Sequence, residues 1–129
     1  MNTLLLDVAI GATNSVLWIL LLVLLLVILI EAVIISLFRI NNFGKAFLNS
    51  SIVNVVSTVI GYLLNTRLDF FSEKISSTEQ WLILFGITVV IEGLMMMVLN
   101  SKVSKGKLWL VTVIMNLVSY IFLYVLSII

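Results

Sequence analysis

Residues 16–38 read VLWILLLVLLLVILIEAVIISLF, an apolar run in which Glu31 is the one charged residue. This run exceeds the ~20 residues that a helix needs to cross a bilayer. Three further apolar runs follow at 46–64, 81–99 and 108–128. Backbone amides in hydrocarbon must be paired within their own segment, which only helices achieve in runs of this kind. The sequence therefore predicts an all-α integral membrane protein with four transmembrane helices.

The composition supports a single membrane domain over residues 1–129. Apolar residues make up 63% of the chain and charged residues 10%, against roughly 25% charged in soluble domains. Cysteine and histidine are both absent, which removes thiolate and imidazole metal ligands and the commonest general base. We therefore expect no catalytic residue, no metal, no cofactor and no enzymatic activity. A net charge of +1 gives no reason to expect a nucleic-acid partner.

The basic residues predict the orientation of the chain. Five of the seven lie in two short connectors that contain no acid, namely Arg39, Lys45, Lys102, Lys105 and Lys107. The positive-inside rule places these connectors in the cytoplasm, so both termini and the 66–80 connector should lie outside. The small size and compact connectors favour a bacterial inner membrane. The N-terminus lacks the basic stretch of a signal peptide, and we expect it to form a short interfacial helix before the first span.

The two halves of the chain share a pattern. Glu31-Ala32 in the first run corresponds to Glu92-Gly93 in the third. The second and fourth runs both contain a hydroxyl residue, then Asn four positions later, Ser three after that, and Tyr: Ser50, Asn54, Ser57 and Tyr62, and Thr112, Asn116, Ser119 and Tyr124. Coincidence in low-diversity apolar sequence is the alternative to duplication. We expect two tandem, parallel helical hairpins (1–65 and 81–129), joined by an outer connector (66–80), that form a four-helix bundle.

Several features of these runs make local predictions. Leu68, Phe71 and Ile75 recur at helical spacing, which predicts either a short amphipathic helix in the connector or a plain ordered loop. Tryptophan is typical of membrane interfaces and should lie there at Trp18, Trp81 and Trp109. Small residues should allow close helix contacts at Ala32, Gly61, Gly86 and Gly93.

A polar layer is the main candidate site. Each glutamate lies eight or ten residues before a basic residue of a connector, and Asn54 and Asn116 each follow a lysine by nine. At 1.5 Å per residue, all four side chains fall roughly 12–15 Å from the basic end of the helices. We expect the polar faces to turn inward and to meet at one level, through Glu31, Asn54, Ser57, Glu92, Asn116 and Ser119.

Two interpretations of this layer stay open. A carboxylate facing lipid costs several kcal/mol, so both glutamates should face inward, and we expect at least one to be protonated at neutral pH. Glutamate–asparagine pairs could act only as polar glue that sets helix register. They could instead form a proton or cation site, the default expectation for intramembrane acids. The proline-free helices favour the first interpretation, since many transporter sites use broken helices.

These observations order the functional hypotheses. A chain with small connectors has little surface for chemistry outside the bilayer. The first expectation is therefore a non-enzymatic subunit or assembly factor of a membrane complex, with other membrane subunits, a second copy and the lipid bilayer as partners. The second is a small proton- or cation-coupled transporter or channel that uses Glu31 and Glu92. A membrane enzyme comes last.

Overall fold

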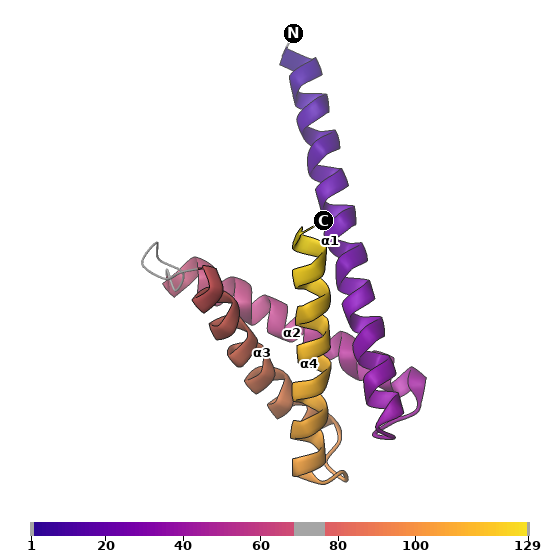
Figure 1. Cartoon of the computed structure of the whole chain (residues 1–129). Coiled ribbons are helices and arrows are strands. Elements are labelled where there is room, and N and C mark those ends of the chain that lie inside the picture. Colours follow the sequence, from indigo (N-terminus) through magenta and orange to yellow (C-terminus); the bar gives the residue numbers. More distant parts are fainter. Residues whose placement is uncertain (1, 69–76, 129) are drawn as a thin grey trace.

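The computed structural model describes the backbone of residues 2–68 and 77–128, and the side chains of residues 14–64 and 78–128. These residues form four helices: α1 (Asn2–Leu37), α2 (Phe43–Leu68), α3 (Ser77–Leu99) and α4 (Lys105–Ile128) (Figure 1). Each helix contains an apolar stretch of 22 or 24 residues. A 22-residue stretch is roughly 33 Å long, which exceeds the ~30 Å hydrocarbon core of a bilayer. The prediction of four helices long and apolar enough to cross a membrane is confirmed.

The ends of two helices differ from the expectations. α1 is one continuous helix from Asn2 to Leu37, without a separate interfacial helix before the span. The chain contains no proline, so no residue forces a break in the helical hydrogen bonds there. α2 continues to Leu68. The connector helix predicted around Phe71 and Ile75 lies outside the described residues.

The turn at residues 38–42 closes the first pair of helices with two caps. Arg39 has a φ of 53°, the left-handed conformation that ends many helices. The Ile40 amide donates to the Ile35 carbonyl over 3.1 Å, and the buried Ile40 side chain packs into the core. At the start of α2, Asn42 Oδ1 accepts a hydrogen bond from the Lys45 amide at 3.0 Å, as a helix N-cap does.

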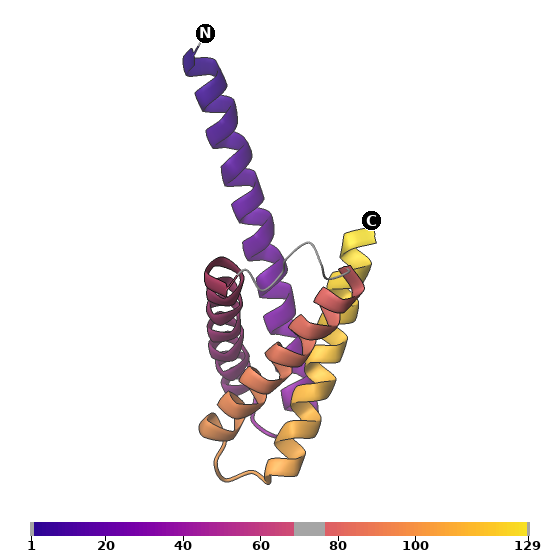
Figure 2. The same ribbon diagram turned by 90° about the vertical axis from the view of Figure 1, so that its left-hand side faces the viewer.

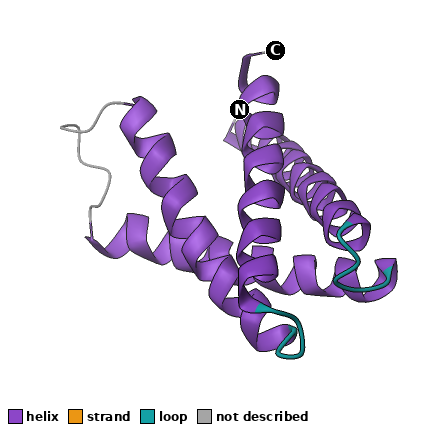
Figure 3. Cartoon of the chain, turned by 60° about the horizontal axis from the view of Figure 1, so that its bottom comes forward, coloured by secondary structure: helices purple, strands orange, loops and turns teal. Residues whose placement is uncertain are grey.

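The helices meet at one end of the molecule and spread apart toward the other. The 38–42 and 100–104 turns both lie at the crowded end, hereafter the turn end (Figures 1 and 3). α1 packs on α2 and α4, and α3 packs on the same two helices, so the contacts form a closed ring. Figure 2 shows the helices diverging away from the turns. Among the described side chains, every buried one lies within 27–54 or 92–119, with the core formed by Ile35, Val53, Met96, Val111 and Met115.

The small residues behave differently from one another. A Cβ at Gly93 would lie within 2.7 Å of three atoms of the Trp109 ring, so this glycine does allow close approach of α4 to α3. Ala32 is fully buried. Gly61 and Gly86 have nothing within 4 Å of a built Cβ, so the prediction of close contacts is wrong for these two. Gly86 is exposed and Gly61 is half-buried, so no neighbouring helix packs tightly against either residue. Trp109 is half-buried against Gly93, whereas Trp18 is 70% exposed.

Candidate functional site

Glu31 lies on α1 with 1% of its surface exposed, and neutral donors surround its carboxyl group. Its Oε2 accepts hydrogen bonds from Ser50 Oγ at 2.9 Å and from Asn54 Nδ2. Its Oε1 accepts one from Ser119 Oγ at 3.0 Å. Two of these donors come from α2 and the third from α4. Glu31 thus joins three helices through one side chain.

Glu92 on α3 is fully buried and has a matching set of donors. Its Oε1 accepts a hydrogen bond from Ser57 Oγ at 2.8 Å, and its Oε2 accepts one from Asn116 Nδ2 at 2.9 Å. Ser57 lies on α2 and Asn116 on α4. Every carboxyl oxygen of the two glutamates therefore receives at least one hydrogen bond.

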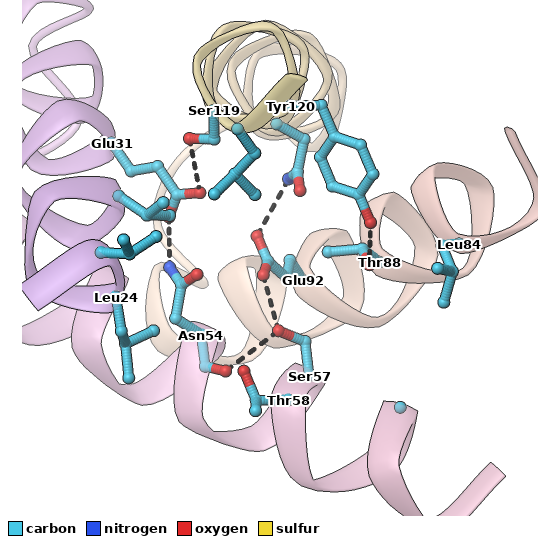
Figure 4. A pocket seen from close by; sticks show the side chains of 15 residues that line it. Leu24, Glu31, Asn54, Ser57, Thr58, Leu84, Thr88, Glu92, Ser119 and Tyr120 are labelled. Atoms are coloured by element: carbon cyan, nitrogen blue, oxygen red, sulfur yellow. Dashed lines mark hydrogen bonds between the residues drawn. The ribbon is translucent and has the colours of Figure 1, made fainter. Parts of the chain in front are cut away.

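The donors follow a reciprocal scheme between the half formed by α1 and α2 and the half formed by α3 and α4. Each asparagine donates to the glutamate of its own half, as Ser50 also does, whereas Ser57 and Ser119 donate across to the glutamate of the other half (Figure 4). The two serine bonds link residues 35 and 88 positions apart in the chain. The six residues of the predicted polar layer are therefore brought together at one place.

Backbone bonds hold the two amide groups in orientation. Asn54 Nδ2 also donates to the Ser50 carbonyl at 3.0 Å, and Asn116 Nδ2 donates to the Thr112 carbonyl at 3.0 Å. An amide nitrogen has two protons, so one serves the helix and the other serves the glutamate. The helical bond four residues back aims each amide at its carboxyl group.

A cavity of about 280 Å³ opens beside the two glutamates (Figure 4). Its polar floor is formed by the six residues of the polar layer, namely Glu31, Asn54, Ser57, Glu92, Asn116 and Ser119. The rest of the lining comes from residues that lie farther from the turn end on each helix, namely Val23, Leu24, Val27, Thr58, Gly61, Leu84, Thr88, Tyr120 and Leu123. Toward the turn end, the core residues Ile35, Val53 and Met115 fill the space below the floor. The cavity is thus closed on one side of the polar layer.

The cavity wall contains two hydroxyl residues that sequence reasoning did not select. Thr88 Oγ1 and Tyr120 OH lie 3.1 Å apart in a hydrogen bond between α3 and α4. Helical spacing could have found them, because Thr88 precedes Glu92 by four residues and Tyr120 follows Asn116 by four. Tyr120 also makes edge-on ring contacts with Trp81 and Phe85, at centroid distances of 5.9 and 5.2 Å.

The cavity holds two acids, and the described side chains that line it include neither lysine nor arginine. The five basic residues of the sequence prediction lie elsewhere. Arg39, Lys45, Lys102, Lys105 and Lys107 are all exposed at the turn end. A pair of ionised carboxyls would therefore have only neutral hydrogen-bond donors beside them.

A second polar cluster lies between the layer and the turns. Asn100 Oδ1 accepts hydrogen bonds from Asn41 Nδ2 at 2.7 Å and from Asn49 Nδ2 at 3.1 Å. Asn100 Nδ2 donates to the Met96 carbonyl at 3.1 Å. Asn49 and Asn100 are buried, so this cluster joins the two halves at the turn end. In the sequence, this cluster was indicated only by an asparagine, Asn100, at the end of the third apolar run.

No known protein family, no curated protein and no solved structure matches this chain significantly. The class of the site is therefore defined by its own geometry. It is a buried pair of glutamates from α1 and α3, held by neutral donors from α2 and α4, at the closed end of a cavity.

Proposed function

We propose that this chain is a small multi-pass membrane protein that binds and carries a proton or a cation at the Glu31–Glu92 pair. One observation carries the proposal: both carboxyl groups line the same 280 Å³ cavity, and none of the described residues that line it is cationic. A purely structural role in helix association needs interhelical hydrogen bonds and tight packing. A cavity beside the acids does not contribute to such a role. Protons or a bound cation would neutralise the pair, which favours the second of the two interpretations of the polar layer.

The proposed setting is a bacterial inner membrane with the basic turn end in the cytoplasm and both termini outside. All five basic connector residues are exposed at one end, as the positive-inside rule requires of cytoplasmic connectors. The cavity extends from the polar layer away from that end. In this orientation the glutamates are reached from the outer side, while the packed core closes the cytoplasmic side.

The reciprocal hydrogen bonds support duplicated hairpins in a four-helix bundle and suggest how binding is coupled to movement. Ser57 and Ser119 each bond the glutamate of the opposite half, and the asparagines stay with their own half. When one carboxyl group takes up a proton or binds a cation, the strength of the hydrogen bond that it accepts from the serine of the other half changes. The relative placement of the two halves therefore depends on the occupancy of the site, as alternating access requires.

Reconstituted vesicles test this function. We expect an imposed pH gradient or cation gradient to drive flux through the wild-type protein, followed with a pH dye and a potassium-sensitive dye. Glu31→Gln and Glu92→Gln keep hydrogen-bonding side chains but cannot ionise, so each should lower the flux at least ten-fold. Glu79→Gln, at an exposed acid near the start of α3, serves as the matched control and should stay within two-fold of wild type. Undiminished flux in the double variant would contradict the proposal.

An accessory subunit of a membrane complex is the second candidate. Its support is the outer half of α1, where Val16, Leu17, Trp18, Ile19 and Leu20 are between 54% and 70% exposed in the single chain. Such a helix face can pack against a partner helix in the bilayer. Under this hypothesis a stable partner co-purifies with the chain, the glutamine variants weaken that assembly, and purified vesicles show no flux.

A further inference from the structure

The Glu31–Glu92 cavity has a polar floor and largely apolar walls. The floor carries the two carboxyl groups, and the walls above it include Val23, Leu24, Val27, Leu84 and Leu123. A hydrated inorganic ion would leave much of its water shell against hydrocarbon. A bare Ca²⁺ or Mg²⁺ ion needs six or more oxygen ligands around it, whereas the cavity offers its acidic oxygens from the floor alone. The distribution of charge favours a ligand with one cationic end and one apolar end.

The size of the cavity limits that ligand. Its 280 Å³ corresponds to the liquid volume of roughly nine water molecules at about 30 Å³ each. It lies just below the 300–1,000 Å³ that is usual for pockets that bind drug-sized molecules. A ligand with fewer than about ten heavy atoms would fill this space.

The carboxyl groups retain acceptor capacity that suits an alkylammonium ion. Two ionised carboxyls offer about eight acceptor positions. Glu31 uses three of its positions for Ser50, Asn54 and Ser119, and Glu92 uses two for Ser57 and Asn116. About three remain, and a primary ammonium group has three N–H donors. We propose that the physiological ligand of this cavity is a small organic ammonium ion with an apolar body, an inference that rests on the proposed function.

A neighbouring aromatic groove supports an organic cation over an inorganic one. A second space of about 460 Å³ lies on the outside of α3 and α4 and is lined by Trp81, Phe85, Tyr120 and Tyr124 among others. Aromatic faces attract organic ammonium ions and tolerate their hydrocarbon parts. Tyr120 lines both spaces, so its ring stands between the groove and the acidic cavity. The groove provides a site through which an amphipathic cation dissolved in the bilayer could reach the glutamates.

Calorimetric titration of the purified full-length protein in nanodiscs tests the ligand class at neutral pH. The probes are cyclohexylammonium, the neutral cyclohexanol of nearly the same shape, and potassium ion. We expect cyclohexylammonium alone to bind, with affinity at least ten-fold weaker in the double variant E31Q/E92Q. Glu79→Gln should stay within two-fold of wild type, which also controls for partition of the amine into lipid. Equal binding of cyclohexanol, or binding of potassium in preference to the amine, would overturn the inference.

A variant that binds a larger ligand more tightly than wild type gives a second test, because a misfolded protein would lose binding and not gain it. Tyr120→Ala removes the partition between the two spaces, so the larger dicyclohexylammonium ion should bind at least ten-fold tighter than to wild type. Tyr124→Ala serves as the control, because Tyr124 lines the groove but not the acidic cavity, and it should bring no gain. If Tyr120→Ala brings no gain either, the ligand assignment is wrong.

The vesicle experiment distinguishes failure of the proposed ligand class from failure of the proposed transport function. Proton or potassium flux that depends on both glutamates, without amine binding, overturns the ligand class and retains the proposed function. Flux that is indifferent to both glutamates overturns the proposed function itself.

Discussion

At the scale of single residues, the site shows how a helical protein holds acids inside apolar surroundings without a basic partner. Each carboxyl oxygen of Glu31 and Glu92 accepts a hydrogen bond from serine or asparagine. Short polar side chains of neighbouring helices donate these bonds directly across the helix interfaces. The neutral donors leave the charge of the pair open to compensation by a proton or a cation.

The cross-half serine bonds carry a prediction about stability. Ser57→Ala leaves Glu92 Oε1 without its serine donor, and Ser119→Ala does the same to Glu31 Oε1. Interhelical hydrogen bonds of this kind contribute about 0.6–1.7 kcal/mol, so each variant should lower the free energy of unfolding by about that amount. Denaturant titration in detergent micelles measures the loss. The control is Ser127→Ala, because Ser127 is exposed and donates to the Tyr124 carbonyl of its own helix; a loss as large there would contradict the assignment.

At the scale of helices, a tryptophan of α4 packs onto α3 at a position where α3 has no side chain. The Trp109 ring occupies the position that a Cβ at Gly93 would take. This contact lies one residue from Glu92, so it also sets how far α4 stands from the carboxyl group. Gly86 lies two turns earlier on α3, where it is exposed and a Cβ would meet nothing within 4 Å. The same residue type therefore has opposite consequences at the two positions.

Alanine substitutions test this difference between the two glycines. Gly93→Ala should destabilise the protein by about 1–3 kcal/mol, because overpacking forces Trp109 or the helices to shift. Gly86→Ala should be neutral or stabilise by up to about 1 kcal/mol through helix propensity. Thermal unfolding in detergent gives both values. Combining Gly93→Ala with Trp109→Leu should restore part of the loss, and no restoration would show that the ring is not the obstacle.

At the scale of the whole molecule, the polar layer divides a packed end from an open end. The buried side chains among the described residues surround the layer and extend toward the turns, and the cavity extends from it in the opposite direction. Under the proposed function, this one-sided cavity corresponds to one of the two access states of a transporter. The side of the membrane toward which the cavity extends depends on whether the turn end faces the cytoplasm.

Cysteine labelling tests the proposed orientation, since the chain contains no cysteine of its own. A membrane-impermeant maleimide should label Ser127→Cys in intact bacterial cells. It should label Ser101→Cys, in the 100–104 turn, only after the cells are permeabilised. The reverse pattern would place the turn end outside and would make the cavity face the cytoplasm.

The sequence by itself determined the four helices and the identity of the polar residues, because both depend on local composition. Length and apolarity mark a span wherever it packs, and an acid within such a span must turn away from lipid. Helical periodicity then selected Asn54, Ser57, Asn116 and Ser119 as partners of the glutamates. Thr88 and Tyr120 obey the same periodicity and were missed, because threonine and tyrosine are ordinary residues in apolar helices.

Only the tertiary structure decided which serine bonds which glutamate, that the cavity lies on one side of the layer, and that Gly93 is in close contact while Gly61 and Gly86 are not. These features depend on the angles at which helices cross. Crossing angles follow from the packing of side chains that are far apart in the chain, and periodicity within one helix carries no information about them.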